Sequence, residues 1–191
     1  NASLVLSILV SLVALLIAWQ YSDRRESNAI VALVVGSIAW ASCSLWYAVA
    51  PTDATRILAS KAAYFGITLT VAAWVVFALL YTGREHLAKP STYALLAVEP
   101  IVALALVWTG YRNLWWSEII RDPAEAGLAI KMTSGPAFVA HSVYSYGLML
   151  AAAFLVLRHV YRSHSIYQRQ AAAMLVAVIT PLVGNALFIT G

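Results

Sequence analysis

The sequence predicts an all-α membrane protein, a bundle of six transmembrane helices with an external β-hairpin in its fourth loop. Of the 191 residues, 62% are hydrophobic and only 10% are charged, whereas a soluble domain averages about 45–50% apolar and about 25% charged residues. The apolar residues form long unbroken runs, which excludes the alternating pattern of a membrane β-barrel strand. Each run is close to the roughly 20 residues that a helix needs to cross the hydrocarbon core.

Six apolar runs, separated by charged residues or proline, are the candidate spans. They cover approximately residues 2–21, 28–50, 55–82, 91–111, 136–158 and 168–190. The first run passes straight into Asp23-Arg24-Arg25 without a small-residue cleavage pattern, so we expect a span and not a signal peptide. The external loop 112–135 is the longest, and its two apolar-rich segments on either side of Pro123 predict the hairpin. No room is left for an ordinary soluble domain, so residues 1–191 are expected to form a single transmembrane domain.

Basic residues are concentrated on one side of the predicted membrane. The loops after the first, third and fifth spans hold seven basic and three acidic residues, a net charge of +4. The loops after the second and fourth spans hold five basic and four acidic residues, a net charge of +1. Since lysine and arginine near span ends favour the cytoplasm, we expect a multi-pass protein of the plasma membrane with its N-terminus outside. Six spans would also leave the C-terminus outside, so we expect a seventh helix that is missing from this chain.

The sequence offers no recognisable catalytic or metal-binding arrangement. It lacks Ser-His-Asp, HExxH, phosphate-loop and dinucleotide-binding motifs, and the single cysteine, Cys43, excludes a disulfide framework. None of the four histidines has the spacing of a zinc site: His86, His141, His159 and His164. We therefore expect no catalytic residue, no metal and no cofactor in this segment. Its basic loops are expected to contact anionic lipid and not nucleic acid.

Glu99 is the one acidic residue inside a predicted span. It lies about nine residues, or roughly 13 Å, from the nearer end of the fourth span, which is close to the middle of the bilayer. A charged residue there costs a few kcal/mol, so it usually faces the bundle and often marks a functional site. Pro100 follows it and is expected to kink the helix. Glu99 is either a protonatable switch or ligand contact, or a neutral carboxyl whose hydrogen bond holds the bundle together.

A second group of polar and aromatic residues is expected near the outer end of the bundle. In the fifth span, His141 and Tyr144 are three residues apart and therefore share a helix face. Other spans contribute residues at comparable depth: Ser44, Tyr47, Tyr64, Thr68, Trp108 and Asn185. Together they predict an outward-facing pocket for a small, partly apolar ligand. Glu99 is expected roughly 10 Å deeper, so a direct contact between Glu99 and His141 is not assumed.

Aromatic residues at this depth have a second explanation. Trp and Tyr gather in a belt at the membrane interface of many membrane proteins, and we favour the belt for Tyr47, Tyr64 and Trp108. His141 and Asn185 do not fit this explanation, because polar groups inside a span need partners. The loop residues Trp115 and Trp116 either close the pocket as a lid or rest on the lipid headgroups.

Several short motifs occur along the chain in a characteristic order: Phe77-Ala78-Leu79-Leu80-Tyr81-Thr82-Gly83-Arg84-Glu85, Glu99-Pro100, Gly135-Pro136-Ala137-Phe138 with His141, Tyr144 and Tyr146, Tyr167-Gln168-Arg169-Gln170, and Pro181-Leu182-Val183-Gly184-Asn185-Ala186-Leu187. In this combination the chain resembles the N-terminal seven-transmembrane sensor region of microbial sensor histidine kinases, of the type common in haloarchaea. Two outer positions depart from the family pattern. Val139 stands where the family often has Trp, and Thr109-Gly110-Tyr111-Arg112 lacks the Thr-Asn and following His.

The resemblance implies a role in two-component signalling. Members place seven helices, with the N-terminus outside, before cytoplasmic PAS, GAF or kinase modules that act with a response regulator. It also implies a homodimer. By the family's pattern, Glu99, His141, Tyr144 and Asn185 are the expected pocket or switch residues. None of the four histidines of this chain is in a phospho-acceptor setting, so kinase chemistry would belong to other modules.

The leading hypothesis is a sensory input module that binds a small ligand, or senses the membrane or outer environment, and relays a helix shift to cytoplasmic domains. The expected ligand-binding or switch residues are Glu99, His141, Tyr144, Asn185, Trp108, Tyr64 and Ser44. The expected hinges are Pro100, Pro181 and Gly184, because proline and glycine weaken a helix locally. The alternatives are a small transporter or channel, and a retinal-binding protein whose lysine lies on a further helix.

Overall fold

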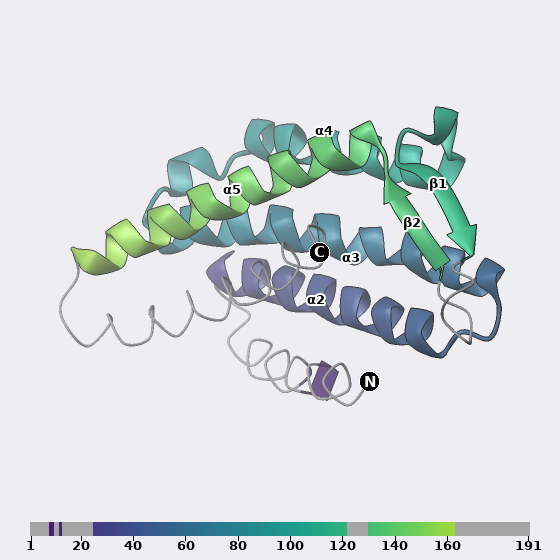
Figure 1. Cartoon of the computed structure of the whole chain (residues 1–191). Helices are drawn as coiled ribbons and strands as arrows, with labels where there is room; N and C mark the ends of the chain where they lie inside the picture. The colour runs from purple at the N-terminus through teal and green to yellow at the C-terminus, as the bar shows by residue number, and fades with distance from the viewer. Residues whose placement is uncertain (1–7, 10–11, 13–24, 122–129, 163–191) are drawn as a thin grey trace.

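The computed structural model describes residues 8–9, 12, 25–121 and 130–162 (Figure 1). These residues form helices α2 (Arg25–Val49), α3 (Asp53–Tyr81), α4 (Pro90–Thr109) and α5 (Pro136–Tyr161), the short 3-10 helices η1 (Glu85–Leu87) and η2 (Tyr111–Asn113), and strands β1 (Trp116–Arg121) and β2 (Ile130–Ser134). In the described ranges, four helices are long and apolar enough to cross a membrane. They confirm four of the predicted spans, while the spans predicted at 2–21 and 168–190 lie outside the described residues.

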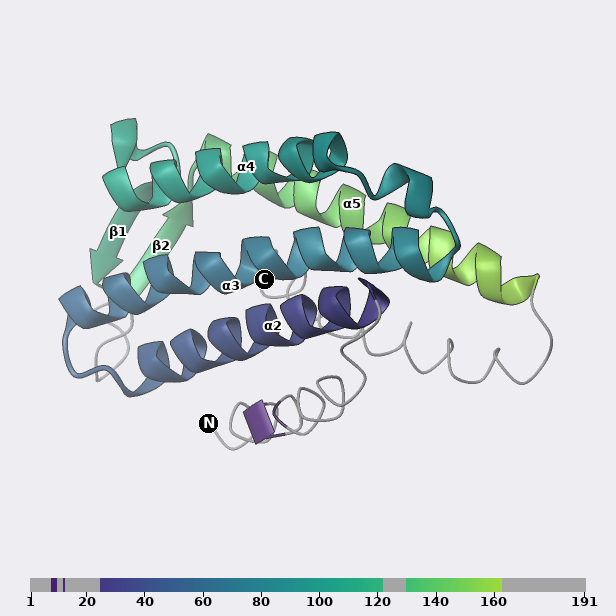
Figure 2. The same ribbon diagram turned by 180° about the vertical axis from the view of Figure 1, so that it is seen from behind.

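The predicted hairpin in the fourth loop is confirmed. Strands β1 and β2 pair antiparallel, from Trp116 opposite Ser134 to Arg121 opposite Ile130, with an irregularity between Trp116 and Glu118. They lie at the end of the bundle where α4 finishes and α5 begins (Figures 1 and 2). We call this the hairpin end, and the opposite end, where α3 finishes and α4 begins, the η1 end.

Helix α3 has clear start and stop signals in its sequence. At its start, Thr52 and Thr55 form a capping box, in which each side-chain oxygen accepts the backbone N–H of the other residue at 3.3 Å. At its end, Gly83 adopts a left-handed φ of 71°. The Gly83 and Arg84 amides then donate to the carbonyls of Leu80 and Leu79, a pattern that satisfies the last turn of the helix.

The boundaries of α4 and α5 are set by proline and glycine. Pro90 and Pro136 each occupy the first turn of a helix, where the missing N–H costs nothing. Gly110 ends α4 with a left-handed φ of 64°, and its amide donates to the carbonyl of Leu106. Pro100 lies inside α4, directly after Glu99, without ending the helix.

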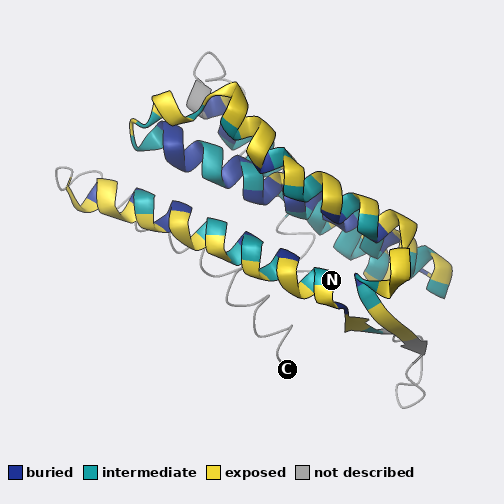
Figure 3. Ribbon diagram, turned by 90° about the horizontal axis from the view of Figure 1, so that it is seen from above, coloured by how far each residue is buried: buried dark blue, intermediate teal, exposed yellow. Residues whose placement is uncertain are grey.

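Helix α3 is the central element of the described bundle. It packs against α2, α4 and α5. Its buried residues, from Ala59 to Leu80, are therefore spread over several faces of the helix. The other helices expose large apolar side chains on their outer faces, such as Leu95 on α4 and Val143 on α5 (Figure 3). Apolar side chains facing outward are what a lipid environment requires of a helix bundle.

Helices α2 and α3 approach each other closely at a pair of glycines. A Cβ atom on Gly66 would stand 2.5 Å from both the carbonyl oxygen of Gly36 and the amide nitrogen of Trp40. On the other helix, a Cβ atom on Gly36 would stand 2.6 Å from Thr70 Oγ1. Small residues at a crossing let backbones touch, which is a main source of helix association in membranes.

Gly66→Ala is expected to lower the free energy of unfolding by about 1–3 kcal/mol, because the new methyl group forces α2 and α3 apart. Gly147→Ala on α5 is the matched control, since a Cβ atom there meets nothing within 4 Å. The measurement is denaturant unfolding in lipid–detergent micelles followed by circular dichroism. Equal stability of the two variants would contradict the close crossing.

Candidate functional site

Glu99 on α4 and His141 on α5 are in direct contact. The Nδ1 atom of His141 lies 2.5 Å from Oε1 of Glu99, and the side chains are only 6% and 22% exposed for His141 and Glu99, respectively. Atoms this close are within hydrogen-bond distance, and which of them donates depends on the tautomer and protonation of the imidazole. Either the imidazole N–H donates to the carboxylate, or the carboxylic acid donates to the imidazole. The pair is thus an ion pair or a neutral acid–base pair, with one proton holding α4 to α5.

The contact corrects the expected depth difference of roughly 10 Å between Glu99 and His141. That distance assumed parallel helices whose outer ends lie at the same level. In the structure the amide of Ala137, in the first turn of α5, donates to the carbonyl of Leu114 at 2.9 Å, so the loop that leaves α4 fixes where α5 begins. The two helices also converge towards the hairpin end and separate towards the η1 end (Figures 1 and 2).

Aromatic rings enclose the imidazole of His141. The ring centroid of Trp115, from the loop before β1, lies 5.1 Å from that of His141, and the centroid of Tyr64, from α3, lies 6.0 Å away. Tyr64 and Trp115 also touch each other edge to face at 4.9 Å, a favourable geometry for aromatic pairs. Both rings are buried, at 8% and 2% exposure for Tyr64 and Trp115. The imidazole is therefore shielded by rings on two sides.

The loop backbone holds Trp115 in place. The carbonyl of Trp115 accepts the amide of Gly135 at 2.8 Å, and Gly135 packs so tightly against Leu114 that a Cβ atom there would collide with the Leu114 carbonyl. Just before this point Arg112 and Asn113 both have left-handed φ angles, 50° and 53°. Non-glycine residues rarely adopt this conformation, and it persists only where surrounding structure enforces it.

The other candidate residues are distributed differently. Tyr144, one turn along α5 from His141, is half-buried and interacts electrostatically with Glu99. Trp108 is exposed near the C-terminal end of α4, and its ring centroid lies 5.8 Å from that of Phe65. The Ser44 hydroxyl donates to the carbonyl of Trp40 within α2. The predictions for Asn185, Pro181 and Gly184 fall outside the described residues.

Of the seven expected site residues, Glu99, His141 and Tyr64 thus meet in one place, and Tyr144 interacts electrostatically with Glu99. Both Tyr64 and Trp115 are buried, which disfavours an interface belt for Tyr64 and a position of Trp115 on the lipid headgroups. The sequence left two explanations open for Trp115, a lid over the pocket or a position on the lipid headgroups. Its place between Gly135 and His141 could not be inferred from the spacing of residues. Among the described residues no three potential metal ligands come together.

A further buried polar side chain lies on the same helix as His141. Ser145 lies one helical turn after His141, its side chain is buried, and its Oγ atom has no hydrogen-bond partner within the described part of the chain. A buried hydroxyl without a partner costs free energy. The Ser145 hydroxyl is therefore available for a new hydrogen bond if the helices rearrange.

The proton shared by Glu99 and His141 predicts thermodynamic coupling. Glu99→Met and His141→Phe each leave a buried polar partner alone, at an expected cost of about 1–3 kcal/mol. The double variant should lose less than the sum of the two, by about 1–2 kcal/mol. Denaturant unfolding in micelles measures all four proteins. Glu118→Gln combined with His141→Phe is the control, since Glu118 is exposed on the hairpin; additive losses for the Glu99 and His141 changes would contradict the contact.

A comparison with protein families identifies the family of this chain. A family model described as the N-terminal 7TM region of histidine kinase matches residues 3–191, which is nearly the whole chain. No curated protein matches the chain. Four apolar, membrane-length helices in the described residues fit a transmembrane region. The chain therefore belongs to the family of N-terminal seven-transmembrane regions of histidine kinases and is a membrane-embedded sensory module.

Proposed function

We propose that the module senses a stimulus through the proton shared by Glu99 and His141 and relays it as a shift of α5 to the cytoplasmic modules of the same chain. The observation that carries the proposal is the buried 2.5 Å contact between these two side chains. A small ligand near the pair, or a change in external pH, alters the number of protons that the pair binds. Each change in protonation alters the attraction between α4 and α5.

A proton-linked contact acts as a switch only if it favours one of two packings of the helices. Helix α5 packs mainly on α3, and its contact with α4 near the hairpin end includes the one polar link between Glu99 and His141. Pro100 follows Glu99 and removes a backbone hydrogen bond from α4. Helix α4 can therefore bend beside the pair at low cost, and in the proposal this bend allows α5 to shift.

Few ionisable groups surround the pair within the described residues. Tyr64 faces it from α3, and Tyr144 faces Glu99 from α5. Lys61, one turn before Tyr64, is occupied elsewhere, because its Nζ donates to the carbonyl of Trp108 at 3.3 Å. The proposal therefore rests on the contact between Glu99 and His141 and not on these neighbours.

The seam between α3 and α5 is the proposed path of the signal. His141 and His159 are 18 residues, or about five turns and 27 Å, apart on the same continuous helix. Between them the indole N–H of Trp74 on α3 donates to the carbonyl of Met149 on α5 at 3.3 Å. At the η1 end the ring of Tyr81 meets that of His159 at 5.7 Å. A displacement of α5 at His141 is thus carried to the η1 end by a stiff element.

The remaining parts of the proposal concern orientation and partners. The charge distribution of the loops supports an external N-terminus and an external hairpin. The η1 end then faces the cytoplasmic kinase modules, which would pass phosphate to a response regulator. Kinases of this kind work as pairs, so a homodimer is part of the proposal.

Glu99→Gln in the full-length protein is expected to change autophosphorylation and its response to external pH, because the substitution removes the carboxyl that contacts His141. The measurement is phosphorylation in proteoliposomes with the internal pH buffered. Glu118→Gln is the control, because this exposed hairpin carboxyl does not touch the pair. Unchanged output across pH in Glu99→Gln would overturn the role of the shared proton.

A further inference from the structure

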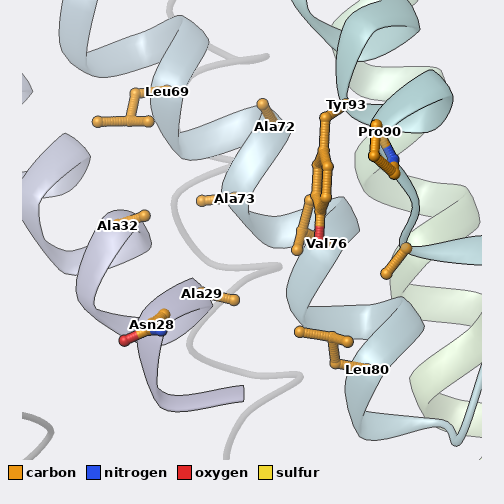
Figure 4. A pocket seen from close by; sticks show the side chains of 11 residues that line it. Asn28, Ala29, Ala32, Leu69, Ala72, Ala73, Val76, Leu80, Pro90 and Tyr93 are labelled. Carbon is orange, nitrogen blue, oxygen red and sulfur yellow. The ribbon is translucent and has the colours of Figure 1, made fainter. Parts of the chain in front are cut away.

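A groove opens between α2, α3 and α4 at the η1 end, and neither Glu99 nor His141 lines it. Its volume is about 580 Å³, within the range of small-molecule sites. Its lining comes from three elements: Asn28, Ala29 and Ala32 of α2, Leu69, Ala72, Ala73, Val76 and Leu80 of α3, and Ala88, Pro90 and Tyr93 around the start of α4 (Figure 4). Apart from Asn28 and the Tyr93 hydroxyl, these side chains are apolar.

The groove exists because of small side chains and the close crossing of two helices. Helices α2 and α3 touch at Gly36 and Gly66, and the groove begins about one turn beyond each glycine, at Ala32 and Leu69. Alanines form its floor on both helices, so no side chain of the described residues fills the space that opens as the helices diverge. The ring of Tyr93 stands along the opposite wall with its hydroxyl towards Val76 (Figure 4).

The length of the groove matches one leaflet of a bilayer. From Leu69 to Leu80 the α3 wall advances 11 residues, or about 16 Å. Half of the hydrocarbon core is about 15 Å. A helix from another copy of the chain would need a continuous stripe through the whole membrane, and the contact of Gly36 with Gly66 closes the groove at half that depth. One acyl chain fits this dimension, and a transmembrane helix does not.

Polar chemistry is confined to the open end of the groove. Helix α4 begins there with Pro90, has no acidic residue in its first turn, and is preceded by the exposed Lys89. The positive end of the helix dipole and the ammonium group both favour an anion. Arg84 lies in the same loop and donates to the Thr82 hydroxyl, whereas Glu85 is the one described carboxyl of this loop. The mouth is therefore weakly basic, as a phosphate group requires.

We propose that this groove is a binding site for an anionic phospholipid of the leaflet at the η1 end. One acyl chain lies on the alanines of α2 and α3, and the phosphate lies beside Lys89 and the start of α4. The lipid fills the wedge between α2 and α4, so its presence fixes the separation of these helices at the end of the bundle nearest the kinase modules. The site is independent of the proposed role of Glu99 and His141.

Photolabelling of the full-length protein tests the site directly. The protein is reconstituted in vesicles of equal amounts of phosphatidylcholine and phosphatidylglycerol, with a trace of phosphatidylglycerol that carries a diazirine in its acyl chain. Adducts after irradiation are expected on peptides 69–80 and 90–93. Ala72→Leu and, independently, Ala32→Leu should each reduce this labelling about fivefold or more, because the added side chain occupies the groove. Ala94→Leu, on the exposed side of α4 next to Tyr93, is the matched control.

The headgroup part of the proposal has its own measurement. Lys89→Gln should reduce labelling by the phosphatidylglycerol probe several-fold and leave labelling by a diazirine phosphatidylcholine unchanged. Excess inorganic phosphate should not compete, because the acyl chain supplies most of the affinity. Labelling spread evenly over all helices, labelling that survives both groove-filling variants, or cross-links between two copies of the chain at Ala32 or Ala72 would each overturn the lipid site.

Discussion

Glu99 and His141 pair because neither side chain has water to bind inside an apolar bundle. In hydrocarbon a carboxyl and an imidazole cannot remain unpaired without a cost of several kcal/mol, so each requires a partner from a neighbouring helix. Their contact at 2.5 Å satisfies both and requires α4 and α5 to converge at the hairpin end. Tyr64 of the central helix and Trp115 of the loop then cover the imidazole. The hairpin end of the described bundle is organised around this contact.

The sequence was sufficient for the elements and for the identity of the two partners. Long apolar runs locate α2 to α5 within a few residues, since bilayer thickness sets the length of each helix. Glu99 and His141 stand out because polar residues inside a span are costly. Their contact was not predictable from the rise per residue, because helix tilt and the starting level of α5 depend on the loop. Gly135 against Leu114 sets that level, and a glycine alone does not reveal which backbone it approaches.

The two ends of the bundle have different chemistry and are joined by stiff elements. At the hairpin end, buried polar and aromatic groups link three helices and a loop. At the η1 end, small apolar residues leave a wedge-shaped groove between α2 and α4. This groove was not predicted from the sequence, because alanines in a span predict close packing as readily as a groove. Helix α5 runs between the ends along α3, with Trp74 bonded to Met149 at its centre. In our proposals, a stimulus at one end and a lipid at the other act on the same set of helices.

Infrared difference spectroscopy of the full-length protein in lipid, with isotope-labelled glutamate, tests the shared proton most directly. A pH step is expected to produce a carboxyl band that disappears in Glu99→Gln and shifts in frequency in His141→Phe, because the imidazole is the hydrogen-bond partner of that carboxyl. A Glu99 band with the same frequency in wild type and His141→Phe would show that the two side chains share no proton, and would contradict the account.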